Sequence, residues 1–316
     1  MKITSVSTSS LLGFRDGARS LTNPSTGLPH PVVAITGPRS SGKTSFMEAI
    51  LAAKEGIAPY GRRTTRQWSN GVAPAVVGID WLFDDTERDF AGLDDARVAT
   101  ETTLGKIGAP GAPGARGVGV FALLDRYRHD ASAGKLDYHA VDRSIPRTAL
   151  SPTGSVERDQ RFLRLTRDPG KYAALTRYLV EVELRLRPNA TRAVFGELFA
   201  KLTTTARFVG ATMVEGPTLV FENAWGKEIT SAELSESERD AMVFAGTAAM
   251  IGLSRSILFV DRPELFQTPS TVVSFVDGLR SLGHDLQVFL ATSSAEILAT
   301  LPKGAILELD ATGGRS

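Results

Sequence analysis

The 316-residue chain contains no cysteine and only four histidines. Without cysteine it cannot form a disulfide scaffold, a zinc ribbon, a cysteine-ligated iron–sulfur cluster or a thiol nucleophile. Four histidines also disfavour a histidine-rich metal site. These absences exclude several classes of secreted scaffold and metalloprotein, and a chain of this length without disulfides fits a cytoplasmic protein.

Long apolar runs and an excess of one charge are also missing. No apolar stretch approaches the roughly 18–20 residues of a membrane-spanning helix, and residues 1–14 lack the apolar core of a signal peptide. The chain has 36 Lys and Arg against 35 Asp and Glu, a net charge of +1. This balance argues against polyanion binding over the whole surface, so any nucleic-acid contact is expected in a local patch. The composition, 42% hydrophobic and 22% charged, is that of a folded globular protein.

The clearest chemical signal is an eight-residue loop between an expected strand and an expected helix. Residues 37–44 read GPRSSGKT and match G-x-x-x-x-G-K-[ST] in full. The glycines let the backbone wrap closely round phosphate, and the N–H groups at the helix N-terminus face the anion. Lys43 is expected to reach the β- and γ-phosphates and Thr44 to bind Mg²⁺. The expected ATP-binding residues are Gly37, Pro38, Arg39, Ser40, Ser41, Gly42, Lys43, Thr44 and Ser45.

Hydrophobic periodicity predicts alternating strands and helices along the rest of the chain. Because they alternate throughout the last hundred residues, a largely parallel sheet is expected there. The expected strands are 32–35, 75–83, 117–124, 135–142, 257–260, 286–291 and 304–309. The expected helices are 44–54, 175–186, 191–207, 235–253 and 270–282, with hairpins near 3–14 and at 213–223.

Further patterns distinguish among classes of P-loop protein. Residues 256–261 read SILFVD, an apolar strand that ends in an aspartate as in a Walker B motif, with Asp261 as an outer ligand of Mg²⁺. Residues 234–239, LSESER, resemble the ABC signature LSxGE/Q with Ser237 in place of glycine. After Asp261, RPEL and Pro269 resemble a D-E-P-E-x-x-x-x-P run, and residues 287–298 resemble the segment Q-V-x-x-x-T-H-S-x-E-I-L.

Together with the opening ITSVSTSSLLGFRD, these motifs make the chain resemble the ABC-type AAA ATPases of the RecF/OLD/SMC-like group over about residues 1–55 and 213–309. The resemblance implies an α/β P-loop NTPase, an ABC-type ATPase head with a β-rich N-terminal lobe and a short helical insertion. Residues 1–150 would form the β-rich lobe with the P-loop, 151–212 the helical subdomain and 213–316 the C-terminal lobe, all within one head.

The resemblance also implies ligands and an assembly. ATP and Mg²⁺ would be bound, with Thr44 and Asp261 on the metal. The signature residues would face ATP held by a second protomer, so a nucleotide-dependent homo- or heterodimer is expected. These residues are Leu234, Ser235, Ser237 and Glu238.

Three positions depart from the family pattern. The family's catalytic glutamate directly follows the Walker B aspartate, where this chain has Arg262; the switch histidine is Ser293 and the signature glycine is Ser237. Glu264 and Ser293 are therefore the remaining candidates for a catalytic role. Loss of a group that orients the attacking water costs about 10²–10⁴ in rate. The sequence thus predicts ATP binding with slow hydrolysis.

Several roles stay open at this point. The family's Q-loop glutamine corresponds to Gln160 or, with less support, Gln67, and either is equally a plain surface amide. Two basic clusters are phosphate or nucleic-acid contacts or ordinary solvated loops. They comprise Arg62, Arg63 and Arg66 beside Trp68, and Arg126, Arg128 and His129.

Four functions are compatible with these residues. The favoured one is an ATP-dependent dimerising switch that acts with a partner in DNA maintenance or anti-phage defence. The alternatives are a non-hydrolysing ATP-bound scaffold or regulatory subunit, a guanylate-type nucleoside monophosphate kinase suggested by the run TTR at 64–66, and, with least support, a transporter subunit. No effector motif is visible, so an effector protein in trans is expected.

Overall fold

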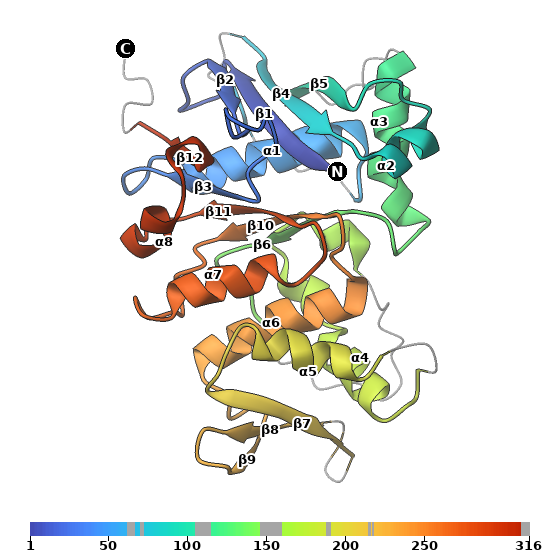
Figure 1. Cartoon of the computed structure of the whole chain (residues 1–316), viewed down its shortest axis with the longest axis vertical. Helices are drawn as coiled ribbons and strands as arrows, with labels where there is room; N and C mark the ends of the chain where they lie inside the picture. The colour runs from blue at the N-terminus through green and yellow to red at the C-terminus, as the bar shows by residue number, and fades with distance from the viewer. Residues whose placement is uncertain are drawn as a thin grey trace.

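The computed structural model describes residues 1–61, 67–69, 73–104, 115–145, 160–187, 191–213, 216 and 218–310. The molecule is elongated, with an antiparallel sheet at one end, a parallel sheet and helices in the middle, and a small antiparallel sheet at the other end (Figure 1). Within the described part of the chain, no helix combines the length and apolar character needed to cross a bilayer.

A five-stranded parallel sheet lies at the centre, in the order β12-β3-β11-β10-β6. Its strands are β3 (Val32–Thr36), β6 (Leu136–His139), β10 (Ile257–Asp261), β11 (Gln287–Ala291) and β12 (Ile306–Glu308). The sequences VVAIT, ILFVD and QVFLA are buried at every position. Strands that are covered on both faces have this continuous apolar character, so the expected parallel sheet is confirmed.

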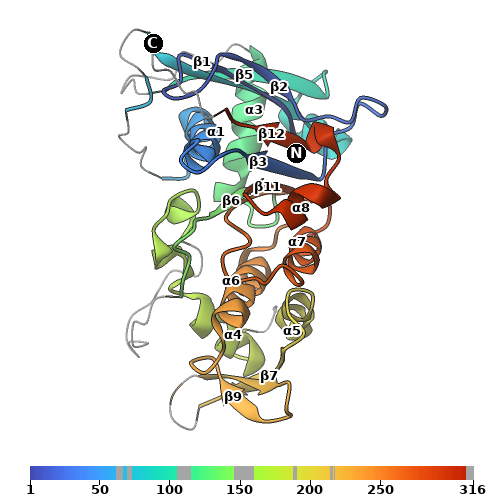
Figure 2. The same cartoon turned by 90° about the vertical axis from the view of Figure 1, so that its left-hand side faces the viewer.

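The alternation of side chains along these strands divides the core in two. Val33, Ile35 and Phe259 face the core that contains α1 (Lys43–Ile57), whereas Leu258 and Val260 face the core that contains α6 (Glu236–Ile251) and α7 (Val272–Arg280). Helix α1 lies between the parallel sheet and the antiparallel sheet, and α6 and α7 lie on the opposite side (Figures 1 and 2). This layering places the start of α1 at the carboxyl edge of the parallel sheet.

The antiparallel sheet covers the outer side of α1 in the order β2-β1-β4-β5. Its strands are β1 (Lys2–Ser9), β2 (Gly17–Ser20), β4 (Ala75–Leu82) and β5 (Arg97–Leu104). β1 and β2 pair as an antiparallel hairpin, and β1 also pairs with β4. The hairpin expected near 3–14 is thus correct in kind, but its second strand lies at Gly17–Ser20 and not within 11–14.

The strand expected at 117–124 is wrong, because this segment belongs to helix α3 (Ala115–Asp125). Val120, Leu123 and Leu124 recur at helical spacing and are buried. Gly119 also lies so close to the Leu93 side chain that an added Cβ would come within 2.6 Å of it. Val and Phe favour a strand locally, but burial of one helical face outweighs this preference and makes the segment a helix.

The middle of the chain contains short helices. They are α2 (Asp85–Ala91), η1 (Arg126–Arg128), η2 (Arg161–Leu163), η3 (Pro169–Tyr172), α4 (Leu175–Glu183) and α5 (Ala193–Ala200), followed late in the chain by α8 (Ala295–Thr300) and η4 (Lys303–Ala305). The second expected helix, 191–207, ends at Ala200, because β7 begins at Ala206.

The small sheet consists of β7 (Ala206–Thr212), β8 (Thr218–Asn223) and β9 (Glu228–Thr230) in sequence order. The hairpin predicted at 213–223 is therefore correct in kind but begins earlier. At the turn between β8 and β9, the Asn223 side chain accepts hydrogen bonds from the Trp225 and Lys227 amides, and Gly226 has a positive φ of 74°. Trp225 at this turn is 89% exposed.

Candidate functional site

The phosphate-binding loop connects the carboxyl end of β3 to the first residue of α1. Gly37 and Gly42 have φ values of 149° and 87°, and an added Cβ would lie 2.4 Å from the Leu309 carbonyl oxygen and 2.9 Å from the Phe14 ring, respectively. Glycine is therefore required at both positions. Because the loop follows a central strand and leads into a helix N-terminus, its amides are placed to bind an anion.

The side chains of the loop fit a polyphosphate. Lys43 Nζ lies over the loop and donates to the Gly37 and Pro38 carbonyl oxygens at 2.9 and 3.0 Å. Ser41 Oγ is buried and has no hydrogen-bond partner among the described residues, so a phosphate oxygen would satisfy it. Arg39 and Ser40 are exposed at the edge of the loop.

The Thr44 hydroxyl donates a 2.7 Å hydrogen bond to the Asp261 carboxylate, which lies 217 positions away in the sequence. Asp261 ends β10 and is 2% exposed. Burial raises the pKa of its carboxyl group, and the Thr44 hydrogen bond opposes this shift. The sequence-predicted metal pair is thus brought together.

A hydroxyl and a carboxylate match the oxygen ligands that Mg²⁺ prefers, with phosphate oxygens and water completing its octahedron. The described residues contain no cluster of three or more His, Asp or Glu side chains that could hold a metal by itself. Thr44 and Asp261 therefore fit Mg²⁺ that arrives with a nucleotide phosphate.

A hollow of about 270 Å³ lies beside the loop. Residues of the N-terminal hairpin, the P-loop, the start of α1, the segment after α1 and the segment after β12 line it: Leu12, Gly13, Phe14, Ser40, Ser41, Gly42, Ser45, Gln67, Trp68 and Asp310. Gln67, one of the two Q-loop candidates, is thus near the loop. The other, Gln160, precedes η2, and neither glutamine is shown to bind the metal.

Backbone contacts between β10 and β11 fix the residues after Asp261. Arg262 has a positive φ of 51°, its amide donates to the Ala291 carbonyl at 2.9 Å, and its side chain is exposed. Glu264 accepts hydrogen bonds from Thr292 Oγ1 at 2.8 Å and from the exposed Ser293 amide at 3.3 Å. The two catalytic candidates, Glu264 and Ser293, therefore lie side by side.

An arginine that the sequence analysis did not single out contacts this region. Arg143 follows β6, is buried, and forms a two-pronged ion pair with Asp240 of α6, at 2.5 and 3.0 Å. Its other N–H groups donate to carbonyl oxygens of Ala140, Asp261 and Arg262. Arg143 thus ties the end of the Walker B strand to α6. The only signal for this role in the sequence is that Arg143 directly follows the strand expected at 135–142.

The signature segment forms the N-terminus of α6. Ser235 caps the helix and Glu238 completes a capping box: the Ser235 amide donates to Glu238 Oε2 at 2.8 Å. Glu238 also accepts from Thr205 Oγ1 at 2.7 Å, and Leu234 is buried. Ser235 is exposed and Ser237 is half-buried beside it, with 3.2 Å between their hydroxyl oxygens.

In the basic cluster that the structure describes, Arg126, Arg128 and His129 each have an acidic partner. Arg126 pairs with Asp130 and lies over the Phe90 ring, and Arg128 pairs with Asp125. His129 also contacts Asp125, which favours an ordinary solvated surface here. Arg62, Arg63, Arg66 and the kinase-like run 64–66 lie outside the described residues.

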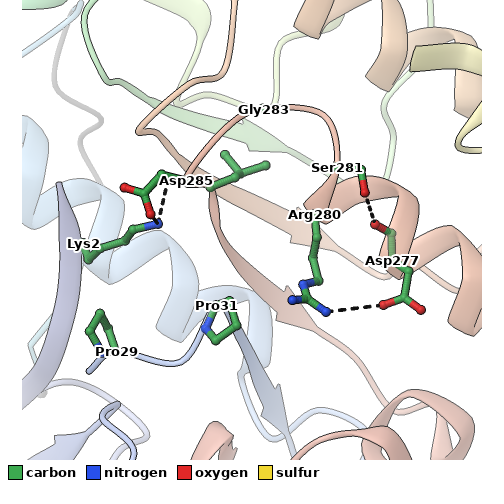
Figure 3. Close-up of a pocket in the computed structure, with 9 residues that line it drawn as sticks. Lys2, Pro29, Pro31, Asp277, Arg280, Ser281, Gly283 and Asp285 are labelled. Atoms are coloured by element: carbon green, nitrogen blue, oxygen red, sulfur yellow. Dashed lines mark hydrogen bonds and ion pairs between the residues drawn. The ribbon is translucent and has the colours of Figure 1, made fainter. Parts of the chain in front are cut away.

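A second hollow, of about 490 Å³, lies at the opposite, amino edge of the parallel sheet (Figure 3). Its cations are already paired, Lys2 with Asp285 and Arg280 with Asp277. This hollow therefore offers no free charge to a ligand, and the P-loop edge remains the candidate site.

Comparison with known proteins supports the fold. A scan of protein-family models finds no match, and no curated protein matches the sequence. Among solved structures, the chain is similar to an SMC head bound to the C-terminal winged-helix domain of ScpA, with a TM-score of 0.52 and 14% identity over 95% of this chain and 92% of that one. It is also similar to an Smc head domain with an extended coiled coil, bound to the C-terminal domain of ScpA and derived from Pyrococcus furiosus, with a TM-score of 0.51 and 12% identity over 94% and 91% of the two chains. The chain therefore has the predicted mixed α/β fold, in an arrangement similar to that of SMC head domains.

Proposed function

We propose that this chain binds ATP and Mg²⁺ at the P-loop and acts as an ATP-dependent switch with slow hydrolysis. The hydrogen bond between Thr44 and Asp261 carries the proposal, because it joins the P-loop helix to the Walker B strand at the place where Mg²⁺ bridges the β- and γ-phosphates in P-loop proteins. The orphaned Ser41 hydroxyl and the lysine over the loop support it.

Slow hydrolysis follows from the groups beside Asp261. A water that attacks the γ-phosphorus needs an acceptor to orient it, and Arg262 has only donors. Glu264 is the next carboxylate along the chain, and hydrogen bonds from Thr292 and Ser293 hold its two oxygens toward those residues. In this chain Lys43 would bind the phosphates, Thr44 and Asp261 would hold Mg²⁺, and the metal would supply charge neutralisation.

Binding of ATP to the purified chain, measured by calorimetry, tests the proposal. We expect Lys43→Ala to weaken ATP binding at least tenfold because it removes the cation that lies over the loop, whereas Lys227→Ala, which changes an exposed lysine on the β8–β9 turn, should leave it unchanged. Equal affinities of wild type and Lys43→Ala would contradict the proposal.

A nucleotide-dependent homo- or heterodimer in the cytoplasm is part of the proposal. The exposed Ser235 at the start of α6 would contact ATP held by a second protomer. A shift in mass on adding ATP and Mg²⁺, seen by light scattering, supports a homodimer.

The proposal also includes a partner or effector protein, as in the SMC heads bound to ScpA, and a role in DNA maintenance or anti-phage defence.

The second candidate is a non-hydrolysing scaffold or regulatory subunit, which Arg262 favours. Tight ATP binding without measurable turnover, with or without DNA, would select it. Transfer of phosphate from ATP to a nucleoside monophosphate would instead select the kinase alternative.

A further inference from the structure

A second polar group lies next to the metal pair. Glu48 is four residues after Thr44 on α1, so the two side chains share one helical face. Arg167, from the segment between η2 and η3, donates from Nε to Glu48 Oε1 at 2.7 Å. These two residues are 119 positions apart, and the pair links the P-loop helix to the segment that leads into the helical part of the chain.

The surroundings of this pair point toward the nucleotide. Arg167 helps to lower the pKa of Asp261, against the larger effect of burial, so its charge acts on the metal-binding carboxylate. Tyr138 of β6 is 1% exposed, and its hydroxyl has no hydrogen-bond partner among the described residues. Burial, and then the nearby charges of Asp261 and Glu48, raise the pKa of Tyr138. The charge of Arg167 thus acts both on Asp261 and on this buried, unsatisfied hydroxyl.

The pair with Glu48 is suited to exchange. The Arg167 side chain is 49% exposed, and half-exposed ion pairs contribute little net stability. Phosphate oxygens, like carboxylate oxygens, bind guanidinium through charge-assisted, often two-pronged hydrogen bonds, so a phosphate can take the place of Glu48. Thr44 and Asp261 would hold the Mg²⁺ that accompanies ATP, and Thr44 is one helical turn from Glu48 on α1.

We infer that Arg167 changes partner, from Glu48 to the γ-phosphate of bound ATP, and thereby distinguishes ATP from ADP. This inference rests on the proposed binding of ATP at residues 37–44. This movement of Arg167 would be passed to the helical part of the chain through its neighbour Asp168, which caps η3 and accepts from the Gly170 amide at 2.7 Å. η3 leads into α4, and α4 packs on α6. Arg167 is a nucleotide-sensing residue in this chain.

Calorimetric affinities for ATP and for ADP, each with Mg²⁺, test the inference on the full chain. We expect Arg167→Ala to weaken ATP binding about tenfold or more, the effect of losing a hydrogen bond to a charged group, and to change ADP binding less than twofold. Glu48→Gln, which releases the arginine, should strengthen ATP binding severalfold. Arg177→Ala is the matched control, because Arg177 forms a similar pair with Glu181 on α4, at 2.7 Å.

The double variant Glu48→Gln with Arg167→Ala separates partner exchange from simple removal of a negative charge. If exchange occurs, the gain from Glu48→Gln disappears when Arg167 is absent. A gain that persists, or equal losses of ATP and ADP binding in Arg167→Ala, overturns the inference. If Lys43→Ala abolishes binding while Arg167→Ala changes nothing, the inference fails alone; if the wild type binds no nucleotide, the proposed function fails with it.

Discussion

Arg262 stands at the position where the family resemblance implies a catalytic glutamate. It follows Asp261, the proposed metal ligand, its backbone is held in the left-handed region by contacts to β11 and Arg143, and its side chain is exposed. Left-handed φ in a residue with a Cβ is strained and persists where surrounding contacts impose it. Contacts with β11 and Arg143 therefore hold the backbone after β10 in this conformation, and the side chain exposed there is a cation.

We predict that Arg262→Glu raises the ATP turnover number at least tenfold, because it supplies the missing acceptor for the attacking water. The phosphate-release assay should use the whole chain with Mg²⁺, and Arg262→Gln is the control, since an amide lacks the carboxylate's charge. Turnover in Arg262→Glu that stays at the wild-type level would show that another element limits hydrolysis.

Contacts between residues of recognisable motifs were predictable, and contacts between residues outside any motif were not. Thr44 and Asp261 follow from two motifs with known roles, and they meet as expected. Arg143 and Arg167 belong to no motif, and their partners Asp240 and Glu48 lie 97 and 119 positions away. Only the packing of α6 and α1 against the parallel sheet brings these charges together.

At the level of elements, the capping box of α6 gives the signature segment its shape. Ser235 and Glu238 satisfy amides at the helix start, and Glu238 is tied to Thr205 as well. Burial raises the pKa of Glu238, whereas the hydrogen bonds from Thr205 and Ser235 lower it, and on balance the pKa is lowered. The residues that would face a partner's nucleotide thus also begin the central helix.

We predict that Glu238→Ala lowers the free energy of unfolding by about 1 kcal/mol, the usual effect of losing a helix cap. Urea unfolding followed by circular dichroism measures it. Glu236→Ala, in the same helical turn but exposed and paired only with Arg239 among the described contacts, should cost less. Equal losses in both variants would show that the capping box adds nothing specific.

Strands and helices with continuous or strictly periodic apolar residues were predicted well, and ambiguous segments were not. β3, β10 and β11 are buried on both faces and could be read directly. The segment 117–124 contains Gly, Val and Phe, which local propensity assigns to a strand, but contacts with α1 and α2 make it a helix. Such contacts are not visible in the local sequence.

At the scale of the whole molecule, buried lysines couple stability to pH. Lys171 is fully buried, donates to the carbonyl oxygens of Tyr138 and Thr166, and has its pKa lowered to about 7 by burial. Burial lowers the pKa of Lys54 to about 7 as well. Between pH 7 and the ordinary lysine value, the unfolded chain binds more protons than the folded chain at these two sites.

Stability should therefore rise with pH above 7, by about 1.4 kcal/mol per pH unit for each lysine in the middle of this window. We predict that Lys171→Met removes one such contribution from the slope of unfolding free energy between pH 7 and 9.5. Urea unfolding at several pH values measures the slope, with Lys201→Met as the exposed control. Parallel pH profiles for Lys171→Met and wild type would contradict the assignment.

The three tryptophans lie in different environments, so their intrinsic fluorescence can report on different parts of the protein. Trp68 lines the hollow beside the P-loop, Trp81 is wholly buried in the antiparallel sheet, and Trp225 is exposed at the turn between β8 and β9. An aqueous quencher reaches Trp225 first, because it alone of the three is exposed. With Trp225→Phe as background, a change in emission on adding nucleotide reports events at the phosphate loop without any attached dye.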